Sequence, residues 1–208
     1  MEPTRENLRA FDQLHRTRVD MLDAGGRLPE AARDWRDARV LHLGCRTGET
    51  TAELVAVGAL VMAIDPYEDR LVAARARVGD SAVFVWAELH AIPAELLRGR
   101  FDAVYSSPGA LDEILDPAAW TAGIGAALRE GGQFVLNDVH PASAPLDHAL
   151  RWRTSYFEEG FVRIGQIVNG LADAGLSIRR FDELPAHDRR LGDPRVPARL
   201  LLTAEKLK

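Results

Sequence analysis

The stretch RVLHLGCRTGETT, residues 39–51, decides the fold of this chain. Residues 40–43 read as a short buried strand, residues 44–48 as a tight glycine loop, and Glu49 begins a helix that ends at Gly58. A strand, a glycine loop and a helix N-terminus form a concave site, and we expect free backbone N–H groups to point into it.

A second apolar run, residues 60–64, follows the helix and ends in Asp65. Neighbouring parallel strands end at the same edge of a sheet, so this carboxylate is placed to accept hydrogen bonds from the two hydroxyls of a ribose. The two features together predict a nucleoside-binding site, although they do not identify the nucleoside.

Composition bounds the class of protein. The 208 residues, 47% hydrophobic and 27% charged, suit one α/β domain. The net charge of -5 argues against a nucleic-acid partner. No apolar run approaches the roughly 18 residues of a membrane span, and no signal-peptide core is present. The single Cys45 has no partner at zinc-site spacing, so we expect no metal. We expect a cytoplasmic protein without a membrane partner. Its oligomeric state stays open, with a homodimer as one option.

Strands and helices alternate along the chain. Further strands are expected at residues 82–86, 101–105, 133–138, 176–181 and 199–204. This alternation predicts an α/β fold with a doubly wound, mostly parallel sheet. The helix that starts at Asp116 and Pro117 is expected to stop at Gly131 and Gly132. The strand ends bring one set of residues to a common rim: His42 with Gly44, Asp65, Glu88, Ser106 and Asp138.

These motifs resemble the class I S-adenosylmethionine-dependent methyltransferases. The resemblance rests on VLHLGCRTG at 40–48, AID at 63–65, Glu88, FDAVYSS at 101–107 and LREGGQF at 128–134. More narrowly, the LHL-x-C of residues 41–45, Asp138-x-His140-Pro141 and residues 166–176 resemble a bacterial subgroup of that family. The resemblance implies a Rossmann-like seven-stranded sheet with an antiparallel last strand. It also implies S-adenosyl-L-methionine as cofactor and methyl transfer to O or N of a small molecule.

The same resemblance divides the chain and assigns a cofactor site. Residues 1–37 would form an N-terminal helical flap, with a plain packing helix as the alternative. Residues 38–208 would form the methyltransferase domain, with a substrate-covering insert at about 139–160. The implied cofactor-binding residues are His42, Gly44, Cys45, Arg46, Thr47, Gly48, Asp65, Pro66, Tyr67, Glu88, Leu89 and Ser106.

Each part of this set has its own implied partner. Residues 44–48 would wrap the methionine end of the cofactor, Asp65 would bind the ribose, Glu88 the adenine, and Ser106 would lie under the sulfonium. Two positions depart from the family pattern, which usually has an acid at His42 and a glycine at Arg46.

Catalytic and substrate residues are hypotheses from residue chemistry. A hydroxyl acceptor needs a base, and histidine titrates near pH 7. His140, just past the fifth strand, is the first candidate, and a structural histidine is the alternative. His148 and His90 are weaker candidates. Trp152, Tyr156 and Phe157 would form an aromatic wall for the substrate, with simple core packing as the alternative.

Other functions stay open. A nicotinamide-dependent oxidoreductase is disfavoured because Arg46 stands at the second glycine position of G-x-G-x-x-G. The departures at His42 and Arg46 leave room for a methyltransferase-fold scaffold protein without catalysis. An S-adenosylmethionine-assisted enzyme that does not transfer methyl groups is a further alternative.

Overall fold

The computed structural model describes residues 28–143, 145–146, 151–185 and 195–208. Most of the predicted N-terminal helical flap, residues 1–37, and the candidate base His148 therefore lie outside the described residues. No helix in the described ranges is both long enough and apolar enough to cross a membrane.

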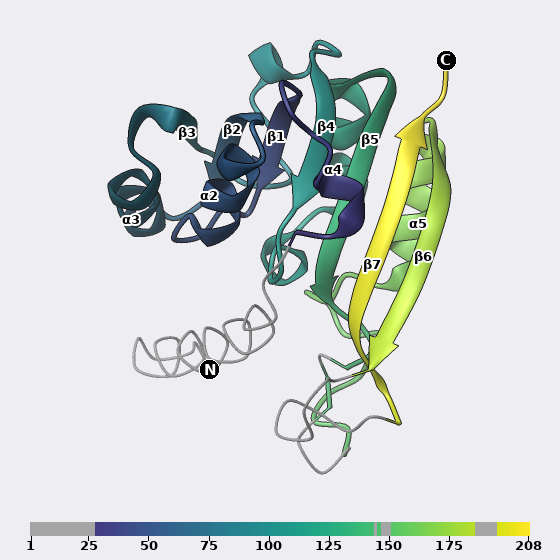
Figure 1. Ribbon diagram of the computed structural model, residues 1–208. Helices are drawn as coiled ribbons and strands as arrows, with labels where there is room; N and C mark the ends of the chain where they lie inside the picture. Colours follow the sequence, from purple (N-terminus) through teal and green to yellow (C-terminus); the bar gives the residue numbers. More distant parts are fainter. Residues whose placement is uncertain (1–27, 144, 147–150, 186–194) are drawn as a thin grey trace.

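One seven-stranded sheet forms the centre of the molecule, with the strand order β3-β2-β1-β4-β5-β7-β6 (Figure 1). The strands are β1 (Arg39–Leu43), β2 (Leu60–Asp65), β3 (Ala82–Trp86), β4 (Phe101–Ser106), β5 (Leu128–Val139), β6 (Leu176–Pro185) and β7 (Pro197–Lys206). β1 to β5 pair in parallel, and β7 runs antiparallel to both of its neighbours. The predicted doubly wound sheet with an antiparallel last strand is confirmed.

Helices connect the parallel strands. They are α2 (Glu49–Ala56), α3 (Glu68–Val78), α4 (Pro117–Ala127) and α5 (Ile164–Asp173), with short 3-10 turns η1 (Glu30–Ala32), η2 (Gly79–Ser81), η3 (Ala94–Leu96) and η4 (Leu111–Glu113). The start of α4 is as predicted, because the Asp116 carboxylate accepts the N–H groups of Ala118 and Ala119 at 3.0 Å.

The predicted end of α4 is wrong. The helix ends at Ala127, and Gly131 and Gly132 belong to β5. Gly131 has a φ of 69°, and a Cβ on Gly132 would lie 2.8 Å from the carbonyl oxygen of Arg129. The glycine pair therefore serves a bend at the start of a strand, where only glycine fits, and not a helix stop.

Two hydrophobic cores cover the two faces of the sheet. One core joins α4 and α5 to the inward residues Leu41, Leu43 and Val104. The other joins α2, α3 and the segment before β1, which crosses the front of the sheet in Figure 1. Within that segment, Trp35 packs edge-on against Tyr105, with ring centroids 6.3 Å apart. The central strands β1 and β4 are thus buried on both sides, and the polar rim of the sheet lies at the strand ends.

Candidate functional site

The glycine loop, residues 44–48, is tied to the neighbouring strand β2. The backbone N–H groups of Gly44 and Cys45 both donate to the carbonyl oxygen of Ile64, at 3.0 and 3.2 Å, and that of Gly48 donates to Cys45 at 2.9 Å. The expectation that these N–H groups point freely into the site is therefore wrong, because they hold the loop in shape.

Three residues of the loop, Gly44, Arg46 and Gly48, adopt left-handed backbone conformations. Gly48 has a φ of 88°, and a Cβ there would lie 2.9 Å from the Cα of Ala74 in α3, so only glycine fits. Arg46 has a φ of 50°, which costs a non-glycine residue about 1 kcal/mol. The glycine that the family pattern has at this position would relieve that strain.

Asp65 at the end of β2 lies directly beside this loop. Its side chain is fully buried, and its carboxylate accepts the backbone N–H of Arg46 at 2.8 Å and that of Tyr67 at 3.1 Å. Burial raises the pKa of Asp65, and the Arg70 guanidinium 3.7 Å away opposes that shift. The structure therefore brings the glycine loop and the predicted ribose-binding carboxylate into one unit.

His42 lies in the core beneath the loop. Its Nδ1 is 3.0 Å from the hydroxyl of Thr51 and its Nε2 is 2.5 Å from that of Ser107. Burial lowers the pKa of His42 to about 3, so the ring is neutral at pH 7. With both nitrogens engaged and no exposed surface, His42 positions the ends of β1 and β4. Its direct contact with a cofactor stays a prediction that this geometry does not favour.

Cys45 and Thr47 complete the loop. Cys45 is 2% exposed, and burial raises the pKa of its thiol, which makes it a packing residue and not a nucleophile. The hydroxyl of Thr47 donates to Glu49 at 2.7 Å, and its carbonyl accepts from Arg77 of α3 at 2.9 Å.

The predicted adenine-side residues divide into two groups. Leu89 is fully buried next to Gly44, with its Cδ1 3.5 Å from the position of a Cβ there, whereas Glu88 is exposed. Pro66 accepts the indole N–H of Trp86 at 2.9 Å. The half-exposed ring of Tyr67 lies under the guanidinium of Arg70, 4.2 Å from ring centroid to carbon.

Ser106 is the predicted site residue at the end of β4. It is fully buried, and its hydroxyl has no hydrogen-bond partner within the described part of the chain. A buried polar group left without a partner costs about 1–3 kcal/mol, so a bound polar ligand at this strand end would stabilise it.

Asp138 at the end of β5 holds the segment that follows β4. Its carboxylate accepts the N–H groups of Gly109 at 2.6 Å, Leu111 at 2.9 Å and Val139 at 2.6 Å. Burial raises the pKa of Asp138 to about 8. As a result Ala110 packs on the glycine loop, 3.0 Å from the position of a Cβ on Gly44.

Two site residues were missed by the sequence reasoning. Glu113, in η4, forms an ion pair with Arg70 of α3, with 2.5 Å between Oε1 and Nη1. Both side chains are about nine-tenths buried, at 11% and 10% exposure. Nothing in the sequence signals this pair, because Arg70 reads as one of many scattered arginines and Glu113 lies in a short loop.

His140 lies at the start of the predicted substrate-covering insert. Its Nε2 donates to Glu183 of β6 at 2.8 Å, and its Nδ1 accepts the N–H of Ala142 at 3.2 Å. Burial lowers the pKa of His140, and the bond to Glu183 opposes that shift. Nδ1 already accepts a hydrogen bond from the N–H of Ala142. His140 can therefore act as a base only if this hydrogen bond breaks.

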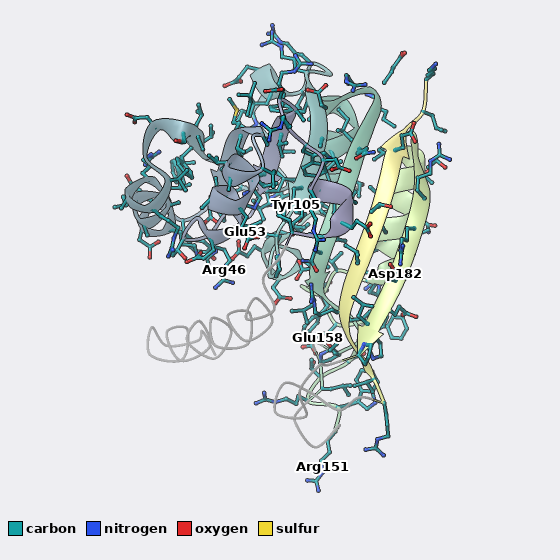
Figure 2. All side chains as sticks on the ribbon, in the orientation of Figure 1. Arg46, Glu53, Tyr105, Arg151, Glu158 and Asp182 are labelled. Carbon is teal, nitrogen blue, oxygen red and sulfur yellow. The ribbon has the colours of Figure 1, made fainter. Side chains whose placement is uncertain are left out.

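The aromatic residues of the insert are described beyond residue 150. Trp152 and Phe157 are 62% and 75% exposed, and they line a small pocket together with Tyr156. The hydroxyl of Tyr156 accepts the N–H of Ile164 at the start of α5. Figure 2 places Glu158 of this segment at the lower end of the molecule, the end toward which β5 and β6 run, and Arg46 on the same side.

Comparisons with known proteins agree with this geometry. Residues 41–134 match the family model of a methyltransferase domain. The structure is similar to an S-adenosylmethionine-dependent methyltransferase from Mesorhizobium loti, with 25% identity, a TM-score of 0.68, and coverage of 86% of this chain and 94% of that one. The fold is that of a methyltransferase.

Further relatives extend the comparison. A provisionally named S-adenosylmethionine-dependent methyltransferase from Listeria monocytogenes has 21% identity and a TM-score of 0.71 over 93% of this chain and 96% of that one. A ubiquinone biosynthesis O-methyltransferase from Parvibaculum lavamentivorans is 24% identical over 72% of this chain. The chain spans 62% of the length of that relative. These likenesses show that the chain has the fold of the S-adenosylmethionine-dependent methyltransferases.

The rim formed by the ends of β1, β2 and β4 contains groups that suit S-adenosylmethionine. Asp65 offers carboxylate oxygens at the end of β2, Ser106 offers a hydroxyl without a partner in the described residues, and the glycine loop lies between them. The donor set therefore fits a ribose and an amino acid moiety, while Arg70 and Glu113 stand directly beside Asp65.

Proposed function

We propose that this protein is an S-adenosylmethionine-dependent methyltransferase that methylates O or N of a small molecule. The observation that carries the proposal is the hydrogen bond from the N–H of Arg46 to the carboxylate of Asp65. It joins the glycine loop to Asp65 at the carboxyl ends of β1 and β2. When bound, the cofactor supplies an electrophilic methyl group with its own leaving group.

The chain's own residues would mainly align the acceptor and exclude water. Asp65 would bind the ribose hydroxyls, and Ser106 and the glycine loop would hold the methionine end. Leu89, packed on Gly44, would lie toward the adenine. His140 is the proposed base for a hydroxyl acceptor, in a form released from Ala142.

A small, partly apolar acceptor is favoured over a macromolecule. The exposed rings of Trp152 and Phe157 follow β5, at the end of the sheet where ligands bind in such folds. The net charge of -5 disfavours nucleic acid, and the relative from Parvibaculum is named for O-methylation in ubiquinone biosynthesis. Phenolic acceptors are therefore the first class to test.

The experiment is calorimetric titration with S-adenosylmethionine and S-adenosylhomocysteine, with NADH as the control. We expect micromolar binding of the first two, about -8 kcal/mol, and none of NADH. A screen of phenols and amines follows, with mass spectrometry of the product. Binding without methylated product would favour a scaffold or a non-methylating enzyme, and no binding would contradict the cofactor assignment.

A further inference from the structure

The Arg70–Glu113 ion pair lies at the place where a nucleoside would meet Asp65. Arg70 projects from α3, which follows β2, and its Nη1 lies 3.7 Å from Oδ1 of Asp65. Glu113 comes from the opposite side, from η4 after β4, and its Oε1 binds the same Nη1 at 2.5 Å. The pair therefore spans the strand ends from β4 to β2, across the glycine loop that lies after β1.

Asp65 has no exposed surface in this arrangement. Each of its carboxylate oxygens accepts one backbone N–H, from Arg46 or Tyr67, which leaves further lone pairs for a ribose. A ribose can use them only if the side chains against the carboxylate move away. We propose that Arg70 and Glu113 form a gate over Asp65, and that the nucleoside of the cofactor binds when Glu113 leaves Arg70.

The geometry confines this movement to one end of the segment after β4. Asp138 holds the N–H groups of Gly109 and Leu111, so the backbone up to Leu111 stays in place. Glu113 follows two residues later, and its backbone N–H donates to the carbonyl oxygen of Ala110 at 3.0 Å, so the movement is a rotation of its side chain away from Arg70. Its second oxygen, Oε2, is buried without a hydrogen-bond partner among the described residues, which makes the closed position costly.

The charges around the gate are balanced. Glu113 is influenced by Arg70 from α3, by Asp65 from β2 and by Arg46 from the glycine loop. Burial raises the pKa of Glu113 to about 7, and the two arginines oppose that shift. The ionised carboxylate is therefore less stable in the closed position than it would be in an open, solvated one, which lowers the cost of leaving Arg70.

The test is the double variant Arg70→Ala/Glu113→Ala, which removes both side chains beside Asp65 and leaves the net charge unchanged. We expect S-adenosylhomocysteine to bind roughly three- to tenfold more tightly than to the wild type, since the closed form no longer competes. Adenosine, which has the ribose but no amino acid moiety, should gain by a similar factor.

A matched control is Arg179→Ala/Glu205→Ala, which removes the exposed ion pair between β6 and β7 and should leave binding unchanged. Thermal unfolding checks that the variants fold. The single variant Glu113→Ala serves if the double variant does not fold, and tighter binding is again expected.

The gate proposal rests on the cofactor assignment, but different experimental results would overturn each of them. Equal or weaker binding by folded gate variants overturns the gate, and weaker binding would make Arg70 and Glu113 direct cofactor contacts. No binding of S-adenosylhomocysteine or adenosine by the wild type or by any variant overturns the cofactor assignment itself.

Discussion

The carboxylate of Asp65 accepts the backbone N–H of Arg46 at 2.8 Å, so the end of β2 fixes the turn of the glycine loop. Asp65 therefore shapes the loop, and under the proposed function it would also bind a ribose. Loss of either would weaken cofactor binding.

Asp65→Ala should lower the affinity for S-adenosylhomocysteine by roughly ten- to a hundredfold, because hydrogen bonds to a charged group are lost. Calorimetric titration measures the change. Asp65→Asn is the matched variant, since it keeps the size of the side chain but not its charge. Unchanged affinity in Asp65→Ala would remove the nucleoside assignment.

The gate predicts a dependence of affinity on pH. The pKa of Glu113 in the closed form is about 7, above its ordinary value of 4.5, so the closed form holds the proton more tightly than an open form would. Acid therefore favours closure, and S-adenosylhomocysteine should bind more tightly at pH 8 than at pH 6. Titrations across this range with the wild type and Glu113→Gln provide the test.

Glu113→Gln is uncharged at every pH, so its affinity should stay flat across the range, near the value of the wild type at pH 6. A wild-type affinity that does not change with pH, or a slope that survives in Glu113→Gln, would assign the titration to another group.

His42 predicts how stability depends on pH on the acid side. Burial lowers its pKa from 6.5 to about 3 in the folded protein, so the unfolded chain binds a proton that the folded chain rejects. The contribution is present above pH 6.5 and is lost as the pH falls toward 3, by up to about 1.4 kcal/mol per pH unit. We therefore expect the free energy of unfolding, measured with denaturant between pH 4 and pH 7, to fall less steeply with decreasing pH in His42→Gln than in the wild type.

His140 separates a catalytic role from a structural one. His140→Ala should reduce turnover and leave the affinity for S-adenosylhomocysteine close to that of the wild type, because the residue lies at the end of β5. Glu183→Gln, which removes the charged partner of the ring but keeps the imidazole, is the comparison. If both variants lose only thermal stability and keep full turnover, His140 is structural.

Trp152 tests the substrate wall. Because its side chain is 62% exposed, Trp152→Ala should cost little folding stability. If the ring contacts the acceptor, the variant raises the KM for that acceptor several-fold and leaves cofactor affinity unchanged. Leu115→Ala is a matched control, since Leu115 is also an exposed apolar residue, at 78% exposure, in the loop before α4. Equal KM values in both variants would contradict the wall.

The positions of the strands along the chain and the mostly parallel type of the sheet could be predicted because the apolar runs are short and separated by glycine and polar residues. Strand β1, its glycine loop and Asp65 lie where the sequence places them, since local pattern and sheet geometry act together there. The predicted helix end at Gly131 and Gly132 is wrong because a glycine pair suits a bend in a strand as well as a helix end.

The interior of the site could not be predicted from the sequence. Arg70 and Glu113 are 43 residues apart in the chain, and their pairing depends on how Asp138 sets the segment after β4. Likewise His140 reads as a free strand-end base, and only the fold shows that Glu183 and Ala142 occupy both ring nitrogens. Long-range polar contacts of this kind leave no periodic signal.

Cys45 is the only cysteine of the chain, and its thiol is buried inside the glycine loop. The native protein therefore carries a built-in chemical reporter at the centre of the site. The rate at which a thiol reagent labels Cys45 measures how often the loop opens, without any engineered probe. Protection of this thiol by added S-adenosylhomocysteine would report ligand binding even before an acceptor is known.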